Sequence, residues 1–166
     1  MYINANQKNI FAYTGARDHQ SEQESVVFVH GTGMDHTVWV LPARFFARHQ
    51  YNVLATDLPG HGRSEGPPPD TIEYMADEVV AAMDGANIEK AALVGHSMGS
   101  LVTLALAARY PERTRSLALI GTAVPMAVHK SLLSSAAQND HAAIDMLTLW
   151  GYSKAAQLGG NENPGM

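Results

Sequence analysis

The chain has 166 residues, of which 46% are hydrophobic and 16% charged, and its formal net charge is −5. This composition excludes a disordered chain and fits one folded domain. The acidic excess disfavours nucleic acid or an anionic membrane as partner, because phosphate binding needs clustered Lys and Arg. The sequence has no cysteine, which excludes disulfides, Cys-ligated zinc and thiol nucleophiles.

The beginning of the sequence predicts neither export nor membrane insertion. Residues 1–6 show no positive segment followed by an apolar one, so we expect no signal peptide. No apolar run approaches the roughly 20 residues that a membrane-spanning helix needs. We therefore expect a cytoplasmic protein without a membrane span.

The first elements alternate between strand and helix. Residues 2–15 predict two short strands joined as a hairpin. Residues 26–29 and 51–56 are apolar, β-rich runs, typical of strands covered on both faces. Between them, residues 39–49 carry a helical stripe, with Pro42 inside its first turn.

A helix is predicted after the Gly- and Pro-rich loop of residues 58–69. We expect Asp70 to cap this helix, with Glu73 as its partner in a capping box. The predicted buried face repeats at helical spacing and consists of Ile72, Met75, Ala76, Val79, Val80 and Met83.

Residues 91–94 and 117–120 predict two further buried strands, with a helix over residues 97–110 between them. The inward face expected for this helix comprises Leu101, Leu104, Ala105 and Ala108. The alternation predicts an α/β fold with a mostly parallel sheet and flanking helices. After Ala123 two helical segments follow, and residues 159–165 predict a loop.

A possible catalytic serine lies in the segment Gly95-His96-Ser97-Met98-Gly99, between a predicted strand and a predicted helix. The G-x-S-x-G spacing is typical of a sharp turn that exposes a serine nucleophile. Such a turn brings strand and helix close together, so Gly95 and Gly99 must be small. The alternative is a glycine-rich turn with an incidental serine.

Two more glycine-rich segments follow the earlier strands. In His30-Gly31-Thr32-Gly33-Met34, the glycines let backbone approach a substrate, and an N–H after His-Gly can donate to an oxyanion. A simple turn is the alternative. The segment 57–64, DLPGHGRS, is interpreted as structural, with Asp57 hydrogen-bonded to backbone rather than catalytic. His19, His36 and His49 receive no role.

Taken in this order, the three motifs resemble those of the α/β-hydrolase superfamily, and among its members the capped esterases, lipase-like enzymes and carbon–carbon bond hydrolases. The resemblance covers residues 2–123. It implies that Ser97 is the nucleophile and that the N–H groups of Met98 and Thr32 form the oxyanion hole. The residues expected to line or support the substrate pocket are His30, Gly31, Gly33 and His96, and those expected to form structural turns are Gly95, Gly99 and Asp57.

The resemblance also predicts how the chain is organised. Residues 1–123 would be the N-terminal part of the hydrolase core, and residues 124–166 the start of a helical cap. The acid and the histidine of the triad normally follow the cap, so we expect both to be missing from this chain. His129 and His141 are weak alternatives for the base. We expect a longer chain or a second polypeptide to supply the remainder and to cover the apolar strand at 117–120.

The leading functional prediction is hydrolysis of an ester-like small molecule by acyl transfer. Alternatives are hydrolysis of a carbon–carbon bond in a diketone, a cofactor-free haloperoxidase-like activity, and a catalytically incomplete fold that binds a ligand or a protein. No cofactor or metal is expected, because the glycine loops lack a P-loop lysine and no carboxylate–histidine cluster shows ligand spacing.

Overall fold

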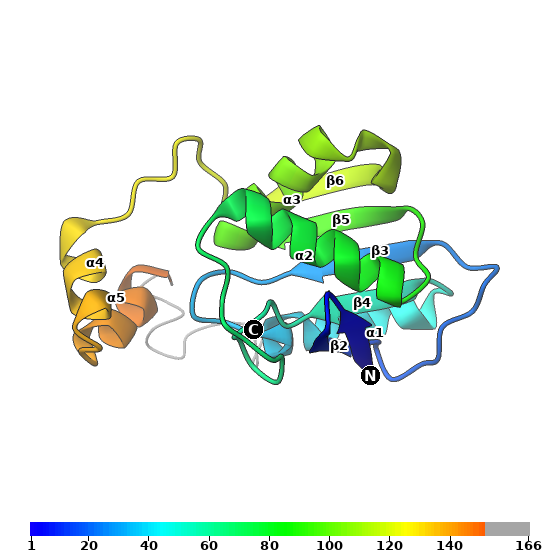
Figure 1. Ribbon diagram of the computed structural model, residues 1–166, viewed down its shortest axis with the longest axis horizontal. Coiled ribbons are helices and arrows are strands. Elements are labelled where there is room, and N and C mark those ends of the chain that lie inside the picture. The colour runs from blue at the N-terminus through cyan, green and yellow to red at the C-terminus, as the bar shows by residue number, and fades with distance from the viewer. Residues whose placement is uncertain (152–166) are drawn as a thin grey trace. The chain divides into compact units, whose positions relative to one another are not determined.

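Residues 1–151 are described by a computed structural model (Figure 1). The chain divides into two units, Met1–Thr122 and Ala123–Met166. The loop predicted over residues 159–165, and the end of the cap predicted over residues 124–166, lie outside the described residues. That the second unit is a cap stays a prediction.

The predicted N-terminal hairpin is present. β1 (Tyr2–Ala5) and β2 (Lys8–Tyr13) pair in antiparallel register, with Ala5 opposite Lys8. The turn residues Asn6 and Gln7 both have positive φ, 49° and 64°. This is the backbone of the two-residue turn whose twist matches that of the flanking strands.

The described residues form one six-stranded sheet in the order β1-β2-β4-β3-β5-β6. β3 (Ser25–Val29), β4 (Asn52–Thr56), β5 (Ala91–His96) and β6 (Thr114–Ile120) run parallel, and β2 joins β4 in antiparallel orientation. β3 and β4 are buried at every position. The prediction of an α/β fold with a mostly parallel sheet is therefore confirmed.

Helices cover both faces of the sheet (Figure 1). α2 (Ile72–Gly85) and α3 (Met98–Arg109) pack on one face, against a core that includes Val27, Leu54 and Leu93. The short η1 (His36–Trp39) and α1 (Val40–Arg48) pack on the other, against Val26 and Phe28. A second short helix, η2 (Pro111–Arg113), leads into β6.

The cap of α2 differs from the prediction. Thr71, not Asp70, is the capping residue: its Oγ1 accepts the N–H of Tyr74 at 3.1 Å. Either side chain can cap a helix, and the sequence does not say at which residue the helix begins. The buried face also contains Glu78, which is 2% exposed and pairs with Lys8 at 2.7 Å.

The buried face of α3 also differs from the prediction. Ala108 is exposed, and Leu101, Leu104 and Ala105 are only half-buried. The residues that are buried are Gly99, Ser100, Val102, Thr103 and Leu106. The start of this helix lies so close to the sheet that small and hydroxyl side chains face it, which a pattern of large apolar residues does not reveal.

β6 is the last strand of the sheet within the described residues. It is largely exposed, with Leu119 38% and Ile120 46% accessible. α3 packs on one face of β6. An open groove runs along β5 and β6 and is lined by Val26, Phe46, Tyr51, Ala92, Leu93, Val94, Arg115, Ser116, Leu117 and Ala118.

The second unit is helical over the residues described. α4 (Lys130–Ala137) is capped by His129, whose Nδ1 accepts the N–H of Ser131 at 3.2 Å, and α5 (Ala142–Gly151) follows. No side chain of either helix is buried. Over residues 1–151, no helix is both long and apolar enough to cross a membrane.

Candidate active site

The three motifs meet at one edge of the sheet. Val29 pairs with Thr56 on one side and with Gly95 on the other, so β3, β4 and β5 end level with one another. The residues that follow these strands, His30, Asp57 and Ser97, therefore lie at the carboxyl edge. In open α/β sheets this edge is where ligands bind.

Ser97 occupies a strained backbone position. It joins β5 to α3 with φ 52° and ψ −122°, outside the regions that a non-glycine residue favours. Hydrogen bonds hold it there: its N–H donates to the carbonyl of Ile120 at 2.9 Å, and its carbonyl accepts from the N–H and the hydroxyl of Ser100. The side chain is partly exposed. This is the sharp strand-to-helix turn that presents a serine for reaction.

The glycines on either side make this turn possible. A Cβ at Gly95 would lie 2.2 Å from the carbonyl oxygen of Gly99, and one at Gly99 would lie 2.3 Å from the carbonyl oxygen of Val29. Both distances are far below van der Waals contact. Strand and helix therefore approach each other as closely as backbone allows.

Of the two residues predicted to form the oxyanion hole, Met98 directly follows Ser97 in the chain, and Thr32 follows a glycine that packs against it. Met98 is the first residue of α3, where backbone N–H groups lack partners within the helix and the helix dipole favours negative charge. Gly31 comes from the other side: a Cβ there would lie 3.2 Å from the Cβ of Ser97. The next residue, Thr32, is exposed, and Gly33 has φ 70°. The loop after β3 thus brings backbone against the serine.

The two pocket histidines have different surroundings. His96 is half-buried, and its Nδ1 lies 3.0 Å from the position of a Cβ at Gly31, next to Ser97. His30 is fully buried, and its place in a substrate pocket stays a prediction. Its ring nitrogens bond to backbone of two loops, at Gly31 and at Leu58.

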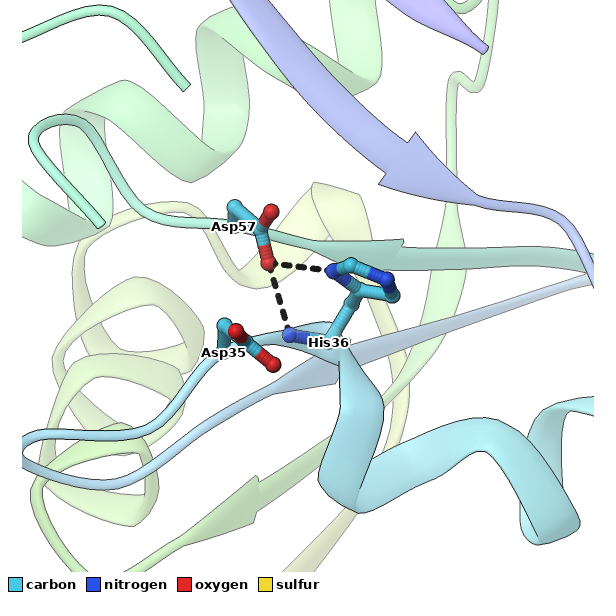
Figure 2. Close-up of side chains that lie close together, drawn as sticks. All are labelled: Asp35, His36 and Asp57. Atoms are coloured by element: carbon cyan, nitrogen blue, oxygen red, sulfur yellow. Dashed lines mark hydrogen bonds and ion pairs between the residues drawn. The ribbon is translucent and has the colours of Figure 1, made fainter. Parts of the chain in front are cut away.

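Asp57 and His36 form a buried pair at the end of β4 (Figure 2). Oδ1 of Asp57 accepts the backbone N–H of His36 at 2.6 Å and its Nδ1–H at 2.8 Å, and Oδ2 accepts the N–H of Arg63 at 2.9 Å. Asp57 is fully buried and His36 is 7% exposed. These contacts support a structural role for Asp57, which ties together the loops after β3 and β4.

No role was predicted for His36. The signal that points to it is its place one residue after Asp35, which caps η1 by accepting the N–H of Thr37 at 2.8 Å. His36 is the first residue of η1 and is buried together with Trp39, three residues further on. Its partner, however, lies 21 residues away in the sequence, and only the parallel pairing of β3 and β4 brings the two together.

Asp35, His36 and Asp57 are near enough to one another to be considered as metal ligands. Several of their oxygens already accept hydrogen bonds: the carboxylate of Asp57 accepts three N–H groups, and Oδ1 of Asp35 accepts the N–H of Thr37. A metal ion would have to displace these donors, and the cluster is therefore better suited to holding two loops than to holding a cation.

The buried ring of His30 makes stability depend on pH. Burial lowers the pKa of His30 from its usual value of about 6.5, against the opposing effect of its bond to Gly31. The unfolded state therefore binds more protons, and the free energy of unfolding should decrease as the pH falls below about 6.5. Urea unfolding at pH 7.5 and 5.5 measures this. His30→Asn should show a smaller decrease, and an equal decrease in both proteins would contradict the prediction.

The two histidines after Ser97 make local contacts in their own unit. His129 caps α4 and its ring lies 5.4 Å from that of Trp150, and His141 pairs with Asp145 at 3.5 Å. Among residues 1–151, no hydrogen bond made by a histidine ends on Ser97.

Comparison with known proteins gives consistent matches. The alpha/beta hydrolase fold family matches residues 24–160. The (E)-2-((N-methylformamido)methylene)succinate hydrolase of Acinetobacter baylyi is 32% identical over 61% of this chain and 38% of its own length. The 2-hydroxymuconate semialdehyde hydrolase of Pseudomonas sp. strain CF600 is 38% identical over 59% of this chain and 36% of its own length.

Among solved structures, the enol-lactonase of Burkholderia xenovorans is similar with a TM-score of 0.81 and 28% identity, over 96% of this chain and 62% of that one. The chain spans little more than a third of the length of the two curated relatives.

Proposed function

Because this chain belongs to the α/β-hydrolase fold family, we propose that it carries the nucleophile and oxyanion hole of a serine hydrolase acting on ester or related acyl substrates. The supporting observation is the backbone of Ser97, held at φ 52° between β5 and α3 with Gly31 packed beside it. A turn of this kind stores strain, and strain of this kind is concentrated at functional sites.

The proposed reaction has two stages. Ser97 Oγ attacks the substrate carbonyl and loses its proton to a histidine base, while the N–H groups of Met98 and Thr32 hold the oxyanion. The tetrahedral intermediate collapses, and the leaving alcohol takes the proton from the histidine. Water then attacks the acyl-enzyme, releases the carboxylic acid and restores the hydroxyl of Ser97.

The histidine base and its acid are proposed to come from polypeptide other than the described residues, because no described histidine bonds to Ser97. The exposed edge of β6 and the groove along it supply a surface for such a segment. An unpaired parallel strand offers backbone N–H and C=O groups to a further strand. The segment would belong to a longer chain or to a second polypeptide, and part of the cap would come from residues 124–166.

Hydrolysis of a carbon–carbon bond is the second candidate. The observation that favours it is the 38% identity to the 2-hydroxymuconate semialdehyde hydrolase. A carbonyl next to the broken bond would accept the same nucleophile and oxyanion hole, so the described residues suit both reactions. The non-enzymatic alternative, a binding module, predicts instead that Ser97 is unreactive.

The test is reaction of the purified protein with a fluorophosphonate, followed by a denaturing intact-mass spectrum. Such a probe reacts with a serine that a base activates, so we expect one adduct, located at Ser97 by peptide mapping and absent from Ser97→Ala. An adduct on the 17.9 kDa chain beside a second polypeptide would support a split hydrolase. A folded protein that forms no adduct would contradict the proposal and favour the binding module.

A further inference from the structure

His30 contacts backbone through both nitrogens of its ring. Nε2 lies 3.1 Å from the backbone nitrogen of Leu58, and Nδ1 lies 2.9 Å from the carbonyl oxygen of Gly31. Leu58 donates its N–H, so Nε2 carries no proton. The proton of the neutral ring is therefore on Nδ1, which donates it to Gly31. Burial, which keeps the ring neutral, agrees with this assignment.

The carbonyl that His30 holds belongs to the peptide unit between Gly31 and Thr32. This peptide bond is trans, so its C=O and its N–H point in opposite directions. The carbonyl oxygen also accepts the N–H of Met34 at 3.3 Å. Because His30 holds the carbonyl, it also fixes the direction of the N–H of Thr32. This N–H lies in the same peptide plane and points away from His30.

The peptide unit between Gly31 and Thr32 needs an anchor because it begins at a glycine. Gly31 packs against Ser97 and His96 so tightly that a Cβ would lie 3.2 Å from the Cβ of Ser97 and 3.0 Å from Nδ1 of His96. Gly33, on the other side of Thr32, has positive φ. The Gly31–Thr32 peptide unit rotates about ψ of Gly31 and φ of Thr32, and glycine permits backbone angles that other residues resist. The ring of His30 therefore adds to the hydrogen bond from Met34 in holding the N–H of Thr32 in one direction.

We propose that His30 is a positioning residue, which clamps the Gly31–Thr32 peptide so that the N–H of Thr32 is held ready to receive the oxyanion. The proposal rests on the proposed function, in which that N–H serves catalysis. His30 touches no reacting atom. It acts through a peptide unit, and it is itself held by Leu58.

The loop after β4 extends the clamp. Leu58 directly follows Asp57, whose carboxylate is fixed by His36 and Arg63. The backbone N–H of Asp57 also donates to the carbonyl of Phe11 at 2.9 Å. The residue before Leu58 is therefore anchored through both its side chain and its backbone. The segment 57–64, which showed no catalytic feature in sequence, reaches the site through the imidazole ring of His30.

The experiment compares three substitutions of His30 in the complete protein. Asn places an N–H₂ donor where Nδ1 stands, and Leu has the same shape without the donor. Gln reaches the position of Nε2 and leaves the Gly31 carbonyl with only the N–H of Met34 as a donor. We expect His30→Asn to keep kcat for a p-nitrophenyl ester within a few-fold. His30→Leu and His30→Gln should lower kcat by about 10² with little change in KM, because one oxyanion donor is misplaced.

Solution NMR of the ¹⁵N-labelled protein supplies a readout that is independent of catalysis. The wild type should show His30 protonated on Nδ1, and single amide resonances for Gly31 and Thr32. In His30→Leu the amide resonances of Gly31 and Thr32 should broaden or double. The amide resonances of Leu106 and Met75 in the core should stay unchanged. A purely structural role would instead lower stability in all three variants without separating Asn from Leu in kcat per folded molecule.

Two outcomes would overturn the clamp: unchanged Gly31 and Thr32 resonances in His30→Leu, or an equal loss of kcat in His30→Asn and His30→Leu. Failure of the proposed function is distinguishable, because it would show as hydrolysis that survives Ser97→Ala or as no hydrolysis at all. In either case the amide resonances still decide whether His30 holds the peptide.

Discussion

Replacing Ser97 by alanine should lower kcat of the complete protein for a short-chain p-nitrophenyl ester by about 10⁴-fold or more. The alanine keeps the backbone turn but has no hydroxyl to form the acyl-enzyme. The oxyanion hole and the pocket remain, so substrate binding should change little and the loss should fall on kcat. The residual rate then measures what positioning and the N–H groups of Met98 and Thr32 achieve alone.

The matched control is Ser21→Ala, in an exposed loop where the hydroxyl contacts only its neighbour Glu22. It should leave kcat unchanged. Near-ultraviolet circular dichroism and thermal unfolding establish that both variants are folded. If Ser97→Ala retained more than a tenth of the activity while folded, Ser97 would not be the nucleophile. A carboxylate or a bound water would then have to be considered.

Replacing Gly99 by alanine should lower the free energy of unfolding by about 3 kcal/mol or more, toward the upper end of what overpacking costs. The new Cβ would lie 2.3 Å from the carbonyl oxygen of Val29 and 2.4 Å from that of His30. Both atoms belong to backbone, one of them in a buried strand. Neither can move aside without displacing α3 from the sheet.

Gly151→Ala is the control for this substitution. Gly151 is the last described residue of α5, and no atom of the described residues lies within 4 Å of a Cβ placed there. The same change of residue should therefore alter stability by less than about 1 kcal/mol, and in the stabilising direction if it acts through helix propensity. Urea unfolding of both variants makes the comparison. Equal effects at the two positions would show that backbone contact at Gly99 is not what requires a glycine.

Much of the fold is predictable because its signals are local. A buried parallel strand is a short apolar run, and a two-residue hairpin needs a turn tolerant of positive φ, as at Asn6. The predictions failed where contacts with distant segments of the chain determine the local structure. Thr71 and Asp70 are both competent caps, and the inward face of α3 is made of small residues because the strand lies so near. Neither fact is visible in hydrophobic spacing.

In the candidate site too, local features could be predicted from the sequence and contacts between distant segments could not. The motif around Ser97 is local, and the structure places it at the strand-to-helix turn that its spacing indicates. The motif around His30 is local too, but it does not reveal that the ring is buried and contacts the backbone of Leu58. The pairing of His36 with Asp57 was missed because it depends on two strands lying side by side. Residues that touch only backbone of remote loops leave no pattern in the sequence.

The positive φ of Ser97 also bears on how this position changes over evolutionary time. At φ 52° a glycine would relieve strain, so folding alone favours glycine there, and under the proposed function the reaction favours serine. Gly95 and Gly99, by contrast, are required by packing whatever the protein does. In a lineage that had given up catalysis, residue 97 would be free to drift while its two glycine neighbours stayed. Under the proposed function, the serine is kept at this position for its reactivity and at a cost in backbone strain.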